Sequence, residues 1–281
     1  MSRLPIARLT LQEVISRRLV LWCAVLSVAF LALFTAGFAF LRGRFDDAPD
    51  PEGIVPLFAA TLVTVLGLYV VSFLASFLAL FLSVGAVSSE ADSGVLQAVL
   101  ARPLRRRSWL LQRWGACAAI AIAYTVLMAG ALLGIARLFS GYAPLDPWRA
   151  VGLIAAEAVL LLTVGMLGST RLSTLANGVV VFSLFGLAWL AGIIEFVGET
   201  IANRAMVNLG IAVSLFVPSD ALWRGASYYA QSPSFVTEVL SEGGLPFSAT
   251  SPPSAALLWW ASGYVVLLLT LAVRAFAKRD L

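Results

Sequence analysis

Residues 19–41 read LVLWCAVLSVAFLALFTAGFAFL, and no charged side chain interrupts them between Arg18 and Arg42. A helix needs about 20 apolar residues to cross the hydrocarbon core of a bilayer, so this stretch is long enough for one crossing. It is also longer than the apolar core of a signal peptide, about 7–15 residues, and no small-residue cleavage site is evident. The stretch therefore predicts a retained membrane-spanning helix.

The composition of the whole chain is that of a membrane protein. Of the 281 residues, 60% are hydrophobic and 12% are charged, and the mean hydropathy is +0.94. Soluble domains are about 45–50% apolar and about 25% charged, so this chain has too little polar surface to stay in water. It contains no His, which excludes Ser-His-Asp catalysis and imidazole metal sites. Cys23 and Cys117 lie inside apolar runs and are expected to be buried hydrophobes rather than a disulfide framework.

Charge-poor intervals predict an all-α integral membrane protein with six transmembrane helices in a single domain, residues 1–281. We expect the spans at about residues 19–41, 54–82, 114–136, 150–170, 172–194 and 255–273. Residues 3–18 are amphipathic and basic, which predicts an interfacial helix that is either a membrane anchor or a docking element. Residues 205–219 are charge-free but too short to cross, so we expect a re-entrant or interfacial segment there.

The segment between the fifth and sixth spans, residues 195–254, is expected to lie outside the membrane or to dip into its outer leaflet. Its pattern predicts one amphipathic helix with Glu195, Glu199 and Asn203 on its polar face. A second short helix is predicted to begin at Ser219, with the Ser219 hydroxyl as its cap and Asp220 in its first turn.

The distribution of Arg and Lys predicts which side of the membrane each connection faces. With six spans and the N-terminus inside, thirteen of the 19 Arg and Lys residues are cytoplasmic and six are external. Cytoplasmic segments carry the excess of positive charge, so we expect both termini in the cytoplasm of a multi-pass protein of the cell membrane, bacterial inner or plasma.

The connection after the second span, residues 88–113, carries the most informative pattern. Residues 88–107 read SSEADSGVLQAVLARPLRRR, in which Val95, Leu96, Val99 and Leu100 recur at helical spacing before Pro103 ends the helix. An apolar stripe on a cytoplasmic helix needs a partner, which is either another protein or the inner face of this one.

The run Glu-x-x-x-Gly-x-Leu-x-x-x-Leu-x-x-Pro, formed by Glu90, Gly94, Leu96, Leu100 and Pro103, resembles the cytoplasmic loop of permeases in the ABC-2 superfamily of ABC transporters. Permeases of that superfamily also have an interfacial N-terminal helix, six spans and outer helices between spans five and six. The resemblance therefore covers nearly the whole chain. This sequence departs from the family pattern at Val95, where Thr is usual.

The resemblance implies the membrane-spanning permease subunit of an ATP-driven exporter, coupled through this loop to a separate ATPase subunit. It also implies assembly with a second copy or a paralogue. The sequence agrees, because no Gly-x-x-x-x-Gly-Lys-[Ser/Thr] motif occurs and Lys278 is the only lysine. We therefore expect no catalytic site, cofactor or metal in this chain, ATP and Mg²⁺ on the partner, and no nucleic acid.

Four arginines near the expected cytoplasmic face have two interpretations. They contact acidic residues of the ATPase, or they set the topology beside anionic lipid headgroups. These residues are Arg105, Arg106, Arg107 and Arg171.

Glu157 is the polar outlier within the fourth span. A carboxylate in a span costs about 2.5–3.5 kcal/mol on insertion scales, so it faces the bundle or a cavity, or is protonated. It is either part of a substrate path or a structural group. The alternatives to an ABC permease are an ion-coupled secondary transporter that uses Glu157 and a non-transporting membrane scaffold.

Overall fold

The computed structural model describes residues 18–46, 54–88, 106–233, 235 and 248–278. All regular structure in these residues is helical. The helices are α2 (Arg18–Asp46), α3 (Ile54–Val84), α6 (Arg106–Ser140), α7 (Pro147–Ser169), α8 (Thr174–Thr200), α9 (Arg204–Phe216), α10 (Ser219–Ala230) and α12 (Ala255–Ala277). The predicted interfacial helix at residues 3–18 lies outside the described residues, apart from Arg18.

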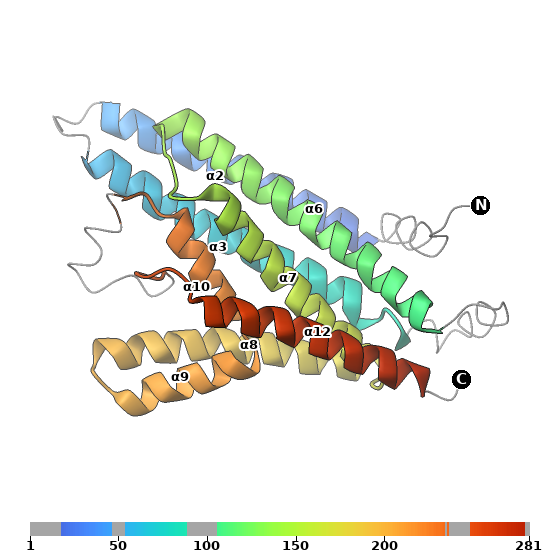
Figure 1. Cartoon of the computed structure of the whole chain (residues 1–281). Helices are drawn as coiled ribbons and strands as arrows, with labels where there is room; N and C mark the ends of the chain where they lie inside the picture. Colours follow the sequence, from blue (N-terminus) through green and yellow to red (C-terminus); the bar gives the residue numbers. More distant parts are fainter. Residues whose placement is uncertain (1–17, 47–53, 89–105, 234, 236–247, 279–281) are drawn as a thin grey trace.

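Six of these helices are long and apolar enough to cross a membrane, as the sequence predicted. They are α2, α3, α6, α7, α8 and α12, and Figure 1 shows them as an elongated bundle. We call the end where α2 begins and α12 ends the terminal end, and the other the opposite end. The α7–α8 turn lies at the terminal end, and α9 folds back along α8 from the opposite end (Figure 1).

α3 and α7 form the centre of the bundle, whereas α2 and α12 are mostly exposed to the surroundings. Leu68, Leu132 and Ile154 pack together in one buried cluster that joins α3, α6 and α7. Packing is close at Gly67, where an added Cβ would lie 2.5 Å from the ring of Phe34. Lipid is as apolar as the core, so such close contacts rather than hydrophobicity hold membrane helices together.

Polar side chains cap the N-terminal ends of several helices. Asp146 accepts a hydrogen bond from the Arg149 amide at 3.1 Å and caps α7, with Pro147 in its first turn. Ser173 caps α8 and Ser254 caps α12 through similar bonds. Each cap satisfies an amide that has no partner within its own helix.

The helix that contains the predicted third span is longer than that span. We expected a membrane span at about residues 114–136, and the helix α6 that contains it begins at Arg106 and ends at Ser140. Arg113, which we took as a boundary, is buried with its guanidinium 5.4 Å from the Trp109 ring. Charged residues delimit the membrane-embedded part of a helix but not the helix itself.

The segment after the fifth span also differs from expectation. We predicted one helix through Glu195, Glu199 and Asn203, but the first two belong to α8, which ends at Thr200. The chain then turns at Ala202, with a φ of 54°, and the Asn203 side chain caps α9. Ser219 does not cap α10, because that helix has Pro218 at its N-cap position and no side-chain cap bond.

The segment predicted to be re-entrant or interfacial forms a bent helix pair, α9 and α10, which meet at an angle of 101°. α9 has 13 residues and is therefore about 20 Å long, which places the α9–α10 break roughly midway along α8. The sequence had indicated the break itself through the short apolar segment and Pro218.

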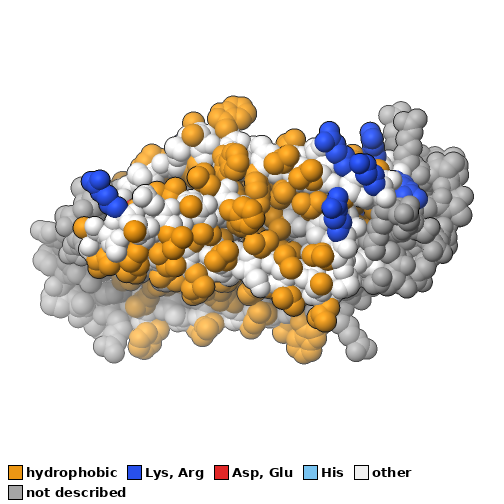
Figure 2. Space-filling view, turned by 90° about the horizontal axis from the view of Figure 1, so that it is seen from below, with side chains coloured by type: hydrophobic (Ala, Val, Ile, Leu, Met, Phe, Trp, Pro, Cys, Tyr) orange, Lys and Arg blue, Asp and Glu red, His pale blue; other side chains and the backbone are white. Residues whose placement is uncertain are grey.

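The surface has the charge distribution of a membrane-embedded bundle. Figure 2 shows a face covered by hydrophobic side chains, with most of its Lys and Arg residues gathered toward the terminal end. The helix bounds place several basic residues there, namely Arg106, Arg107, Arg171, Arg274 and Lys278.

Candidate functional site

Glu157 is the most enclosed acidic side chain of the spans, with 3% of its surface exposed. It lies near the middle of α7 and accepts a hydrogen bond from Ser72 Oγ of α3, with a distance of 2.6 Å to Oε2. Ser76, one turn further along α3, donates a longer bond of 3.4 Å to Oε1. Glu157 has no ion-pair partner among the residues that the structure describes. It therefore joins the two central helices through neutral hydroxyl groups.

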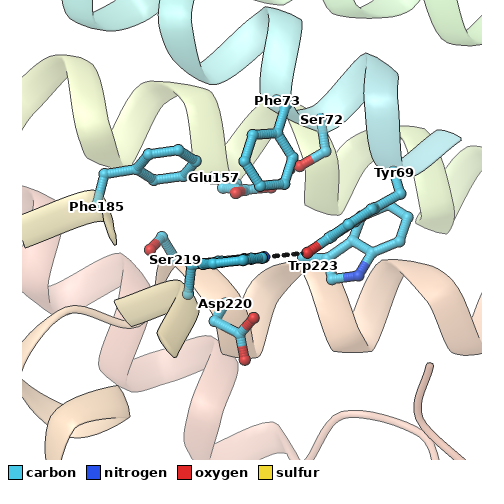
Figure 3. Close-up of a pocket in the computed structure, with 9 residues that line it drawn as sticks. Tyr69, Ser72, Phe73, Glu157, Phe185, Ser219, Asp220 and Trp223 are labelled. Carbon is cyan, nitrogen blue, oxygen red and sulfur yellow. Dashed lines mark hydrogen bonds between the residues drawn. The ribbon is translucent and has the colours of Figure 1, made fainter. Parts of the chain in front are cut away.

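A small cavity of about 10 Å³ lies beside Glu157, where α3, α7, α8 and α10 meet. Figure 3 shows Glu157 and Ser72 on one side of it and Ser219 and Asp220 on the α10 side, with the Asp220 carboxylate turned away from Glu157. The volume suits one water-sized species. Its remaining wall is aromatic and consists of Tyr69, Phe73, Phe185, Trp189 and Trp223.

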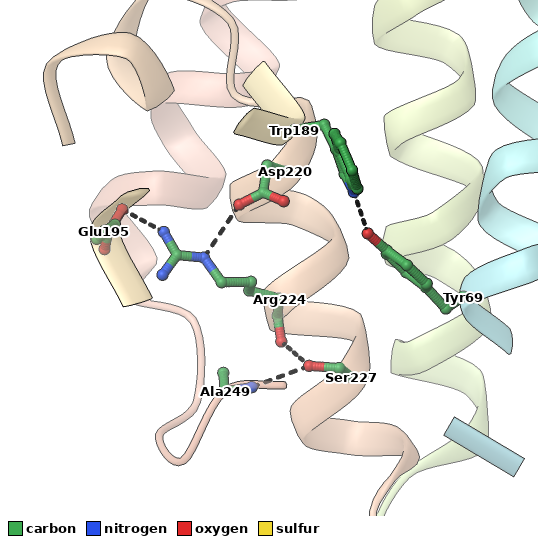
Figure 4. Close-up of polar contacts among 7 residues, drawn as sticks. All are labelled: Tyr69, Trp189, Glu195, Asp220, Arg224, Ser227 and Ala249. Atoms are coloured by element: carbon green, nitrogen blue, oxygen red, sulfur yellow. Dashed lines mark hydrogen bonds and ion pairs between the residues drawn. The ribbon is translucent and has the colours of Figure 1, made fainter. Parts of the chain in front are cut away.

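The aromatic wall is held in place by contacts between helices. Trp189 of α8 donates its Nε1–H to the Tyr69 hydroxyl of α3 (Figure 4). Tyr69 also packs on Trp223 of α10, with ring centroids 4.9 Å apart, and Phe73 meets Phe185 edge-on at 5.4 Å. Three helices thus enclose the cavity with large side chains that leave little free space.

An ion-pair cluster holds α10 against α8 (Figure 4). Arg224 Nη2 lies 2.5 Å from Glu195 Oε2, and Arg224 Nε lies 3.2 Å from Asp220 Oδ2. All three side chains are mostly enclosed, with 11–22% of their surface exposed. One cation therefore serves two carboxylates, and Asp220 belongs both to this cluster and to the cavity wall.

Glycines bring the helices around this cluster into close contact. A Cβ on Gly210 of α9 would lie 2.5 Å from Glu195 Cβ and 2.9 Å from the Ala191 carbonyl oxygen. A Cβ on Gly192 of α8 would lie 2.1 Å from Asp220 Oδ2. Only a residue without a side chain permits these approaches, as is common between helices in membranes.

A second polar cluster lies at the terminal end, where α3, α7 and α8 meet. The buried Asn177 of α8 donates from Nδ2 to Val84 O at 2.8 Å and to Gly165 O at 2.9 Å. Ser88, which follows α3 in the chain, shares a 2.7 Å hydrogen bond with Thr174. The connection between α3 and α6 therefore leaves the bundle directly beside the α7–α8 turn.

The structure places only some of the residues that the sequence singled out. The motif residues and one arginine lie outside the described residues, namely Glu90, Gly94, Leu96, Leu100, Pro103 and Arg105. Arg106 and Arg107 begin α6, and the exposed Arg171 lies in the α7–α8 turn. Glu157 faces a cavity, but that cavity is too small for a cargo molecule as it stands.

The sequence analysis missed the partners of these groups. Nothing in it pointed to Asn177 or Arg224 as a link between helices. Ser72 and Ser76, spaced by one helical turn in a span without charged residues, were a usable sign of a polar face. No group of three or more acidic or Cys side chains that would suit a metal ion occurs within the described ranges.

Comparison with known proteins identifies the architecture. Residues 5–281 match the family model described as ABC-2 family transporter protein. No curated protein matches the sequence at a significant level. The family match covers nearly the whole chain and agrees with the six spans and the re-entrant pair described above. The chain therefore belongs to the ABC-2 family of transporter membrane proteins, as a multi-pass component that has no catalytic site and depends on a separate ATPase.

Proposed function

We propose that this chain is the permease subunit of an ATP-driven exporter, in which ATP hydrolysis on a separate nucleotide-binding subunit drives cargo movement or mechanical work across the membrane. One observation supports this most directly. The α3–α6 connection, which carries the ABC-2 motif, leaves the bundle at the terminal end beside the α7–α8 turn. The α3–α6 and α7–α8 connections therefore lie at the same end of the bundle, where one docked subunit could contact both.

We place the terminal end in the cytoplasm. Arg106, Arg107, Arg171, Arg274 and Lys278 lie there, and cytoplasmic segments of membrane proteins carry the excess of positive charge. The opposite end, with α9 and α10, then faces the outer leaflet and closes that side of the bundle. Both chain termini are cytoplasmic in this arrangement.

The motif residues are the proposed contact with the ATPase. Leu96 and Leu100 are proposed to supply an apolar stripe and Glu90 a polar contact, with Gly94 as the joint and Pro103 as the end of the contact segment, as the sequence pattern predicts. Movement of this segment would reach the bundle through Ser88 and Thr174, and from there through Asn177, which bonds to α3 and α7.

The arginines beside the motif extend this contact surface. Arg105, Arg106, Arg107 and Arg171 are proposed to pair with acidic residues of the ATPase, in addition to any role beside lipid headgroups. Arg107 and Arg171 are exposed at this end of the bundle, and exposed charges speed the association of a partner that binds and releases during each cycle.

The cargo path is proposed to run past Glu157 within the bundle, and the subunit is proposed to work together with a second permease copy or a paralogue. Glu157 and its aromatic surroundings are the polar centre of the span region, although the cavity would have to widen to admit a molecule. The secondary-transporter alternative has less support, because the chain belongs to a family whose members depend on an ATPase.

Co-purification from the native operon tests the assembly. The detergent-solubilised complex is expected to contain an ATPase subunit, and a complex without one would contradict the proposal.

Gly94→Val and Glu90→Lys are expected to reduce stimulation of ATP hydrolysis while membrane insertion survives. Gly134→Val on α6 is the matched control, because a Cβ there meets nothing within 4 Å. Equal loss in all three variants would show that the loop is not the coupling element.

Glu157→Gln tests the cargo path. The substitution keeps the shape and removes the charge, so a group that contacts cargo is expected to lose transport at a normal expression level. Full transport by Glu157→Gln would assign Glu157 a purely structural role.

A further inference from the structure

An apolar groove of about 300 Å³ lies where α7, α10 and α12 approach one another. Its floor is buried and consists of Leu160, Leu222 and Ala261, which pack in one cluster. Its rim includes Ala156 and Ser262, and both of these residues are exposed. Protein interiors have few voids larger than a water molecule, so a gap of this volume calls for an occupant.

The groove exists because α12 is packed closely near both of its ends and less closely between them. At the start of α12, Pro253 and Leu153 of α7 lie 3.0 Å and 3.3 Å from the place of a Cβ on Gly225 of α10. At the other end, Phe276 packs in a buried cluster with Met166 of α7. Between these two contacts, the short side chains on the rim leave the gap unfilled.

The groove lies at the depth of the hydrocarbon core. Trp148 near the start of α7 and Trp259 near the start of α12 are 81% and 78% exposed, as is typical of Trp at a membrane–water interface. Leu153 and Leu160 line the groove and lie about 8 Å and 18 Å along α7 from Trp148. One leaflet supplies about 15 Å of hydrocarbon, so the groove opens into the leaflet at the opposite end of the bundle.

The lining of the groove suits hydrocarbon and offers little to a polar ligand. Eight of its nine lining residues are apolar, and the hydroxyl group of the ninth, Ser262, already donates to Leu258 O at 2.8 Å. An apolar cavity of about 150 Å³ stays free of water and binds benzene, so a larger apolar gap is expected to take up hydrocarbon. At this depth the surrounding hydrocarbon is the acyl chains of the bilayer.

We propose that this groove binds one acyl chain of a phospholipid from the leaflet at the opposite end of the bundle. The acyl chain would pass Ala156 and Ser262 on the rim and lie on Leu160 and Leu222, while its headgroup stays near the level of Trp148. It would fill the gap between α7 and α12 and join both helices to α10. The inference depends neither on the cargo nor on the orientation proposed above.

Photolabelling in a membrane tests the groove. The full-length protein is reconstituted in vesicles of phosphatidylethanolamine and phosphatidylglycerol that contain a trace of phosphatidylcholine with a diazirine in the middle of one acyl chain. Leu160 and Leu222 are 0% and 2% exposed, so lipid around the protein does not reach them, whereas an acyl chain in the groove does. Light is therefore expected to attach the probe to both residues, as located by mass spectrometry of the peptides.

A variant with a filled groove shows whether the label arrives by this route. Ala156→Leu combined with Ser262→Leu fills the groove from its exposed rim, where the larger side chains displace only lipid. Labelling of Leu160 and Leu222 is expected to fall to the level measured without light. Ala256→Leu is the matched control, because it adds the same side chain to an exposed position of α12 outside the groove and should leave the labelling unchanged.

Three results would overturn the proposal. An unmodified protein without label on Leu160 and Leu222 would show that acyl chains do not enter the groove. Equal labelling of the filled variant and the unmodified protein would show that the probe reaches these residues by another route. Loss of self-association in the filled variant, without label in the unmodified protein, would make a second copy the occupant. If the combined variant fails to fold, Ala156→Leu and Ser262→Leu are measured singly against the same control.

Discussion

Gly168 and Asn177 provide a direct test of the link between helices at the terminal end. Asn177 Nδ2 donates two hydrogen bonds, to Val84 O at 2.8 Å and to Gly165 O at 2.9 Å. A Cβ on Gly168 would lie 1.9 Å from Asn177 Oδ1 and 2.9 Å from its Cγ. Both groups cannot occupy these positions, so Gly168→Ala must turn the amide away and break its bonds.

The size of the effect follows from the two bonds. A hydrogen bond between membrane helices contributes about 0.6 kcal/mol on average and up to about 1.7, so losing both costs roughly 1–3 kcal/mol. Replacing Gly by Ala in a helix gains up to about 1 kcal/mol. Gly168→Ala is therefore expected to cost about 1 kcal/mol in the otherwise unchanged chain. In an Asn177→Ala background it should be neutral or stabilising, because no amide remains to be displaced.

A double-mutant cycle measures this coupling. The free energy of unfolding is determined for the unmodified chain, both single variants and the double variant by SDS titration in mixed micelles. We expect an interaction energy of about 1–2 kcal/mol between the two positions. Gly152→Ala on the same helix is the control, because a Cβ there meets nothing within 4 Å. An equal cost of Gly168→Ala in both backgrounds would refute the role given to Asn177.

Further predictions concern the opposite end of the bundle. Arg224→Gln leaves two enclosed carboxylates without their cation and is expected to lower the free energy of unfolding by roughly 3 kcal/mol. Arg149→Gln is the control: its side chain is 66% exposed, so the free energy of unfolding should change by less than about 1 kcal/mol. Gly210→Ala is expected to cost about 1–3 kcal/mol in the same titration, because its Cβ would meet the backbone of α8, and Gly186→Ala, with open space around it, should not destabilise. Burial raises the pKa of Tyr142, a fully buried residue of the α6–α7 connection whose hydroxyl has no hydrogen-bond partner among the described residues. The contribution of this raised pKa to stability is complete below about pH 10, the usual Tyr value, and is lost as the pH rises above it. Tyr142→Phe should therefore raise the free energy of unfolding by about 1 kcal/mol at pH 7, and should lessen the fall of that free energy at alkaline pH. A lower free energy of unfolding at pH 7 would show that the hydroxyl has a partner.

The helix break after α8 shows where pattern reading failed. Glu195, Glu199 and Asn203 recur every four residues, which predicted one continuous amphipathic helix. The chain instead turns at Ala202, and Glu195 faces Arg224, which is 29 positions away. The prediction that Glu195 lies in a helix was correct. The spacing could not show which way its side chain faces, because its partner Arg224 belongs to another helix.

The sequence by itself determined that six helices are long and apolar enough to span a membrane, and that a short broken segment lies between the last two. Each of these depends on how many consecutive apolar residues cover the thickness of a bilayer, which is a local property of the chain. The tertiary structure alone decided which residues meet, such as Glu157 with Ser72, 85 positions apart, and Asn177 with Val84, 93 apart. In a soluble helix the apolar face marks the core, but here both the lipid-facing and the core-facing sides are apolar. The rotation of each span about its axis, and with it the cavity beside Glu157, is therefore set by close packing at glycines and by a few polar contacts between helices.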